Sequence, residues 1–92
     1  MISSFKCRDT EALFNGTRVA RFANVASVAI RKLQMIDAAT RVETLRIAPQ
    51  NRLEKLSGDR RGQWSIRVND QFRVCFEWRD HAAWHVEIVD YH

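Results

Sequence analysis

Residues 63–79 read Q-W-S-I-R-V-N-D-Q-F-R-V-C-F-E-W-R, and apolar residues occupy every second position on both sides of N-D-Q. This alternation predicts two half-buried antiparallel strands joined by a short connection. A two-residue turn would place Val68 opposite Gln71 and mix apolar with polar residues on one face. A three-residue loop keeps the faces separate, because the side chains of a strand point alternately to opposite sides. This loop, residues 69–71, gives the pairs Val68 with Phe72, Ile66 with Val74, Trp64 with Phe76, and Arg67 with Arg73.

Further strands are predicted on both sides of this hairpin. Alternation continues in residues 84–89, where Trp84, Val86 and Ile88 are predicted to face the core. A turn near residues 80–83 would connect this strand to the hairpin. Shorter strands are predicted at residues 2–6 and 52–56.

The first half of the chain has a helical pattern. A short helix is predicted at residues 10–15, with Asp9 as its N-cap and Gly16 just after its end. A longer helix is predicted at residues 21–39, because apolar residues recur there at steps of three and four and form a stripe suited to core packing. A helical turn is expected around residues 42–45, followed by a break at Pro49.

These elements predict a single domain, residues 1–92, of the α+β class. Two N-terminal helices would pack on one face of a small, mainly antiparallel sheet. The opposite sheet face would carry Arg67, Arg73, Glu87, Val89 and Tyr91. Like charges directly opposite each other destabilise a sheet unless an anion lies between them. The pair Arg67 and Arg73 is therefore a candidate phosphate site, with two solvated arginines as the alternative.

Composition limits the possible functions. The chain has a net charge of +4, with arginine more frequent than lysine, which favours an anionic partner and nucleic acid first. No apolar run is long enough for a membrane span and no signal peptide is evident, so a cytoplasmic protein without membrane contact is expected. Cys7 and Cys75 are expected to be reduced, largely buried thiols. The cysteine and histidine spacing suits no metal, and no cofactor is expected.

The last residues could contribute to RNA cleavage. Metal-free cleavage needs a base for the ribose 2′-OH, a cation for the phosphorane, and an acid for the leaving oxygen. Arginine suits the cation role, and Asp90, Tyr91 and His92 could transfer protons, while a tyrosine could also stack on a base. In a regular strand Asp90 and His92 point away from Tyr91, so joint action requires the strand to twist or end near residue 90.

Over essentially its whole length, and most specifically in its second half, the chain resembles the HigB-type toxins, the plasmid maintenance system killer group of the RelE/ParE superfamily. The similarity includes I-x-S-F-K at the start, G-D-R-x-G at residues 58–62, the strand N-x-x-F-R-V, and the final V-D-Y-H. The resemblance implies a toxin that cuts translated mRNA on the ribosome, without metal or cofactor. It also implies a HigA-like helix-turn-helix antitoxin, through which alone the toxin would reach operator DNA.

Site residues are also carried over from the resemblance. Arg73 matches the family's catalytic arginine, and Asp90, Tyr91 and His92 match its functional C-terminal residues. The expected RNA or ribosome contacts are Arg52, Lys55, Arg60, Arg61 and Arg67. Two positions depart from the family pattern: Ser57 replaces a common lysine of the basic turn, and position 54 is Glu where some members have a catalytic histidine. Weak activity, or a non-catalytic protein that poisons DNA gyrase or only binds its antitoxin, is therefore the alternative.

Overall fold

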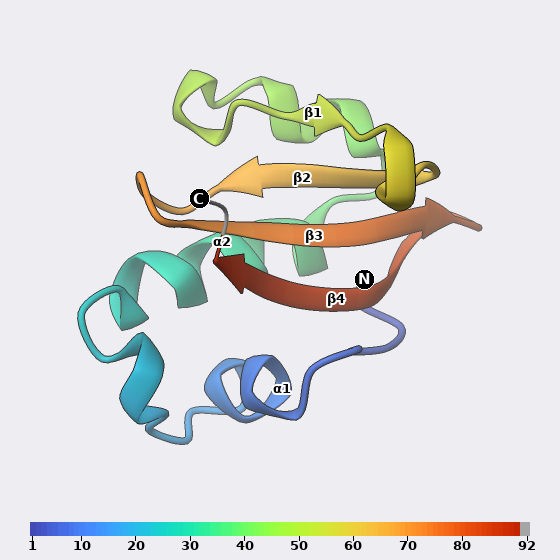
Figure 1. The fold of residues 1–92 in the computed structure, drawn as a ribbon. Helices are drawn as coiled ribbons and strands as arrows, with labels where there is room; N and C mark the ends of the chain where they lie inside the picture. Colours follow the sequence, from blue (N-terminus) through green and yellow to red (C-terminus); the bar gives the residue numbers. More distant parts are fainter. Residues whose placement is uncertain (91–92) are drawn as a thin grey trace.

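The computed structural model describes residues 1–90, and the predicted site residues Tyr91 and His92 lie outside this range. Four strands form one antiparallel sheet in the order β1-β2-β3-β4. The strands are β1 (Glu54–Lys55), β2 (Gln63–Arg67), β3 (Phe72–Arg79) and β4 (Ala82–Asp90). Two α-helices, α1 (Arg8–Phe14) and α2 (Ala26–Ala38), precede the sheet in the chain and pack against it, α2 lying behind the strands in Figure 1. The predicted α+β arrangement is confirmed.

The predicted hairpin register is confirmed. Ile66 pairs with Val74, Trp64 with Phe76, and Arg67 with Arg73. The loop is closed by the Asn69 side chain, whose Oδ1 accepts hydrogen bonds from the backbone N–H groups of Gln71 and Phe72, at 2.9 and 2.7 Å. Asparagine favours such turns because its side-chain oxygen reaches the N–H groups two or three residues later.

β4 differs from the prediction at Trp84. The turn between β3 and β4 contains only Asp80 and His81, both at positive φ, as in a type I′ turn. A β-bulge follows, because Glu77 pairs with Trp84 but Cys75 pairs with Glu87. The extra residue of the bulge moves Trp84 to the face opposite the core, so the prediction that it faces the core is wrong.

The helices begin at other residues than predicted. α1 starts at Arg8, and its N-cap position is Cys7 rather than Asp9. Gly16 ends the helix as predicted: it has φ +92°, and the N–H groups of Gly16 and Thr17 reach back to the last turn in a Schellman motif. α2 starts only at Ala26, because residues 20–22 form a separate 3₁₀ turn, η1. This turn places the fully buried Phe22 edge-on against Phe72, with the two ring centroids 5.6 Å apart.

The predicted edge strands are shorter than expected. Residues 2–6 form only two isolated bridges, which run parallel to β4. β1 contains two residues instead of five, because Arg52 has a left-handed backbone with φ 45° that is incompatible with a strand. Three 3₁₀ turns complete this part of the chain: η2 (Val42–Arg46), η3 (Pro49–Asn51) and η4 (Gly58–Arg60).

The hydrophobic core lies between the helices and one face of the sheet. Fully buried side chains of α2 meet fully buried side chains of β2, β3 and β4 there, which confirms the predicted role of the helical stripe. These residues include Leu33, Ile36, Ile66, Val74, Phe76 and Val86. No helix within residues 1–90 is long and apolar enough to cross a membrane.

Candidate active site

Arg73 is held at the centre of the sheet face opposite the helices. Its side chain projects from β3, and the residue is only 9% exposed. Nε donates to the hydroxyl of the fully buried Ser65 at 2.8 Å, and Nη2 donates to the backbone carbonyl of Arg52 at 2.7 Å. Because both bonds use fixed groups on neighbouring strands and turns, the orientation of the guanidinium is set before any ligand arrives.

A second arginine lies on the same face. Arg60, from η4, donates to Glu87 of β4 at 2.9 Å and to Gln63 of β2 at 3.0 Å. Lys6 lies 3.7 Å from the same Glu87 carboxylate. Figure 1 shows this yellow turn in front of the strands, on the side away from α2. The basic turn predicted from the sequence is therefore anchored over the sheet by a partly buried ion pair.

Cys75 lies in the electrostatic field of both arginines. The thiol is fully buried, and burial raises its pKa, with Glu87 adding to this effect and Arg60 and Arg73 opposing it. It is therefore protonated at neutral pH and unsuited to a nucleophilic role. The prediction that both cysteines are buried is right for Cys75 and wrong for Cys7, which is partly exposed.

The other predicted contacts surround this centre. Arg52, Lys55 and Arg61 are exposed, and the Lys55 ammonium lies 5.6 Å from the centre of the Trp64 ring. Asp90 is exposed at the end of β4, where its carboxylate accepts a hydrogen bond from the Gln71 side chain at 3.1 Å. The exposed cations give this face the charge and accessibility that a polyanion needs.

Arg67 does not share the surroundings of Arg73, although the two residues are paired in the sheet. Its guanidinium forms an ion pair with Asp70 and lines a pocket beside α2. β2 is an edge strand at this point, because β1 begins only at Glu54, opposite Ser65, so the Arg67 side chain can reach around the edge. The structure thus separates the two arginines that the sequence placed together as a phosphate site.

Comparison with known proteins identifies the family. A model described as the RelE-like toxin of the type II toxin–antitoxin system HigB matches residues 9–92. The chain belongs to the HigB-like toxin family. It is 38% identical over 85 residues to Toxin HigB-1 of Vibrio cholerae serotype O1, covering 90% of each chain. It is 34% identical over 93 residues to Endoribonuclease HigB of Proteus vulgaris, covering both chains completely.

A solved structure agrees on the fold. The YoeB-YefM complex from Staphylococcus aureus contains a chain that superposes with a TM-score of 0.60 at 15% identity, covering 100% of this chain and 98% of that one. As a toxin of a type II toxin–antitoxin module, this HigB-like protein has an antitoxin as its partner.

Two polar residues of the HigB-like site were not predicted as site residues from the sequence. Ser65 is the hydroxyl that orients Arg73, and Lys6 brings a further cation to Glu87. Strand alternation could have indicated Ser65, because it shares a face with the paired Arg73. Lys6 belongs to the I-x-S-F-K motif, but its place beside Glu87 could not be predicted, because it depends on how the irregular N-terminal segment lies beside β4. Within residues 1–90, no three His, Cys, Asp or Glu side chains are close enough together to hold a metal ion.

Proposed function

We propose that this HigB-like toxin is a ribosome-dependent endoribonuclease that inhibits translation by cutting translated mRNA. The observation that carries the proposal is the buried, pre-oriented Arg73, which faces a surface rimmed by exposed cations. Similarity over the full length to a protein named Endoribonuclease HigB supports it. Activity on the ribosome would place the protein in the cytoplasm.

In the proposed mechanism, Arg73 stabilises the charge that develops on the scissile phosphate. Ser65 and the Arg52 carbonyl hold the guanidinium fork in position, so little reorganisation is needed during the reaction. Asp90, Tyr91 and His92 would supply proton transfer to and from the ribose and the leaving oxygen, and Tyr91 could stack on a base. Side chains then provide base, cation and acid, so the mechanism requires neither metal nor cofactor.

RNA and ribosome contacts are assigned to the cations around Arg73. These are Arg52, Lys55, Arg60 and Arg61. Their phosphate contacts would supply affinity without sequence preference. Arg67 lies in a different pocket, and its predicted RNA contact is not included in this mechanism. The antitoxin would be a HigA-like helix-turn-helix protein that neutralises the toxin and carries it to operator DNA.

A second candidate function is a non-catalytic toxin, and Ser57 is the observation that favours it. This exposed residue stands at the start of η4, where the resemblance leads us to expect a lysine. Arg60, a cation of the same turn that could replace this charge, already pairs with Glu87. A protein of this kind would poison DNA gyrase or only bind its antitoxin.

Expression of the toxin followed by mapping of 5′ ends on a translated message distinguishes these functions. We expect cuts within codons that disappear on Arg73→Ala and on deletion of His92. Arg18→Ala is the control, because Arg18 is exposed in the loop after α1 and has no proposed role. Growth arrest with intact messages and damaged or relaxed DNA would instead show gyrase poisoning, and no arrest would show a degenerate toxin.

Restoring a lysine tests whether Ser57 limits the activity. We expect Ser57→Lys to raise the rate of message cleavage by about tenfold, because an added cation near the phosphate is worth roughly 1 to 2 kcal/mol. The neighbouring exposed change Asp59→Asn also adds one positive charge and serves as the control. Equal rates for Ser57→Lys and the wild type would assign the lysine's role to another residue.

A further inference from the structure

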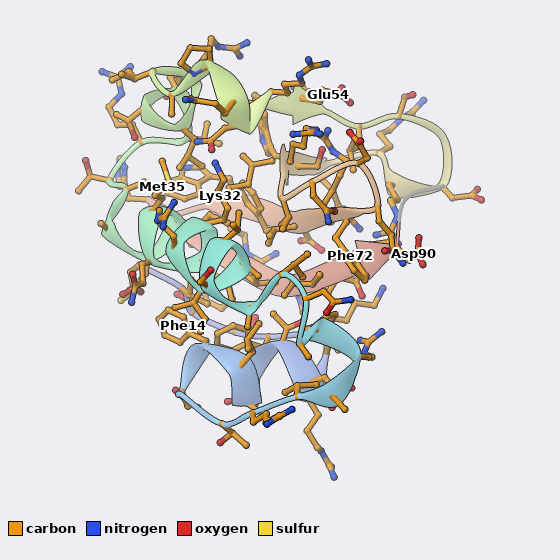
Figure 2. The ribbon with its side chains drawn as sticks, turned by 90° about the vertical axis from the view of Figure 1, so that its left-hand side faces the viewer. Phe14, Lys32, Met35, Glu54, Phe72 and Asp90 are labelled. Atoms are coloured by element: carbon orange, nitrogen blue, oxygen red, sulfur yellow. The ribbon has the colours of Figure 1, made fainter. Side chains whose placement is uncertain are left out.

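A pocket of about 350 Å³ lies beside α2, η3 and the end of β2. Its lining residues are Val28, Arg31, Lys32, Met35, Ala48, Gln50, Arg67 and Val68. Figure 2 shows Lys32 and Met35 together on the α2 side of the molecule, away from Asp90. No step of the proposed cleavage mechanism uses this pocket.

The pocket concentrates positive charge. Arg31, Lys32 and Arg67 all line it, and none of its eight lining residues is acidic. Burial lowers the pKa of Lys32, and the nearby charges of Arg31 and Arg67 lower it further. Asp70, from the loop after β2, pairs with Arg67 at its rim. One carboxylate therefore faces three cations, and a net positive charge remains.

One of these cations is held in a fixed position. The Lys32 ammonium donates to the side-chain oxygen of Asn51 at 2.5 Å. Asn51 is fully buried, and its amide nitrogen donates in turn to the Leu45 carbonyl at 2.9 Å. Because Asn51 is neutral, it orients Lys32 without neutralising it, and the ammonium remains available for an anion.

Apart from Gln50, the remaining lining of the pocket is apolar. Val28, Met35, Ala48 and Val68 form the walls next to the cations. A nucleic-acid backbone would use the charges but gain little from these walls, because it contacts proteins mainly through its phosphates. A peptide that combines a carboxylate with an aliphatic side chain would use both parts of the pocket.

We propose that this pocket binds an acidic segment of the antitoxin, with a carboxylate near Lys32 and Arg31 and an aliphatic side chain between Val28 and Met35. The proposal rests on the antitoxin partnership of the family and not on RNA cleavage. The pocket lies on the helical side of the sheet, whereas Arg73 lies on the other side.

The test measures binding of the purified toxin to the antitoxin encoded beside its gene, by isothermal titration calorimetry. We expect the double variant Arg31→Glu, Lys32→Glu to weaken binding at least tenfold, and Met35→Gln to weaken it several-fold. The matched control is Arg8→Glu, Arg18→Glu, which makes the same change in charge at exposed residues outside the pocket. Arg31→Glu alone, which keeps the Lys32–Asn51 bond, covers the case in which the double variant fails to fold.

The outcomes separate this proposal from its competitors. Affinity within twofold of the wild type for Arg31→Glu and Met35→Gln would overturn it. Loss of ribosome co-sedimentation with unchanged antitoxin binding would also overturn it, and would make the pocket an RNA contact. Because the titration needs no cleavage, it remains decisive even if the wild-type toxin proves inactive on messages.

Discussion

Two groups of cations lie on opposite sides of one small sheet, and they differ in how their charge is balanced. On the side away from the helices, Arg60 pairs with Glu87, and Arg73 is held by the Ser65 hydroxyl and the Arg52 carbonyl. Beside α2, Lys32 donates to the neutral Asn51, and no acidic residue among residues 1–90 lines its pocket.

Clusters of basic residues can therefore serve two kinds of function, depending on how their charge is balanced. Cations fixed by several internal partners are pre-organised, which suits stabilisation of a transition state. Cations left with an excess of positive charge repel one another, and a bound anion relieves this repulsion, which suits recognition of a partner. Replacement of an arginine by methionine should therefore lower the free energy of unfolding in the group around Arg73 and raise it in the pocket beside α2.

The largest effect is expected for Arg73→Met. This change removes the charge and leaves the Ser65 hydroxyl and the Arg52 carbonyl without the hydrogen bonds that Arg73 donates to them. We expect the free energy of unfolding to fall by about 2 kcal/mol, since such unsatisfied groups each cost roughly 1 to 3 kcal/mol. Cleavage of a translated message should fall at least about 100-fold, as for other lost oxyanion donors.

Denaturant unfolding and single-turnover cleavage measure the two effects of Arg73→Met separately. Arg73→Lys is the matched variant, because it keeps the charge but cannot form both bonds of the guanidinium fork. Cleavage that survives both substitutions would remove Arg73 from the catalytic role. Unchanged stability would show that its internal hydrogen bonds do not hold the fold.

A smaller loss in the free energy of unfolding is expected when the Glu87 carboxylate is neutralised. Glu87→Gln leaves Arg60 and Lys6 without their shared carboxylate, next to the buried thiol of Cys75. We expect a loss of about 1 kcal/mol in the free energy of unfolding, more than for an exposed pair because the Glu87 side chain is only 16% exposed. Thermal or urea unfolding measures it.

Glu77→Gln is the control for this prediction. Glu77 lies on the neighbouring strand β3 and pairs with Arg79, but both side chains are more exposed. Its removal should change stability by less than about 0.5 kcal/mol. Equal losses at Glu77 and Glu87 would mean that burial adds nothing to the Glu87 pair.

The sequence predicted the β2–β3 hairpin better than it predicted β4. In the hairpin, alternation excludes an even loop length, because only an odd loop keeps Ile66 and Val74 on the same face. In β4, a bulge at His85 adds one residue, and period-2 reasoning cannot detect such an insertion. For this reason, the predicted sheet face of the Trp84 side chain is wrong.

In the candidate site, too, positions that depend on one hairpin could be predicted, whereas positions that depend on distant segments could not. Arg73 could be predicted because its pairing partner and its face follow from the hairpin. The separation of Arg67 from Arg73 could not be predicted, because it depends on β1 beginning only at Glu54 and on α2 lying beside the edge of β2. Likewise, the charge balance between Glu87, Arg60 and Lys6 joins three segments that are distant in the chain.

The smallest effect, and the one of opposite sign, is expected for Arg31→Met. Removing one cation from the pocket should raise the free energy of unfolding by a few tenths of a kcal/mol at low salt, and the gain should vanish near 1 M NaCl, where charges are screened within about 3 Å.

The pKa of Lys32 should rise toward its ordinary value of 10.5 in Arg31→Met, because Arg31 is one cause of its lowering. Since the unfolded wild type binds the Lys32 proton more tightly than the folded form, wild-type stability should increase with pH through the interval below 10.5. This slope should be smaller in Arg31→Met, and NMR titration of the lysine side chains together with urea unfolding at pH 8 to 10 would measure both changes. A loss of stability in Arg31→Met at low salt would show that the charges of this pocket are already balanced, and the contrast with the Arg73 side would not hold.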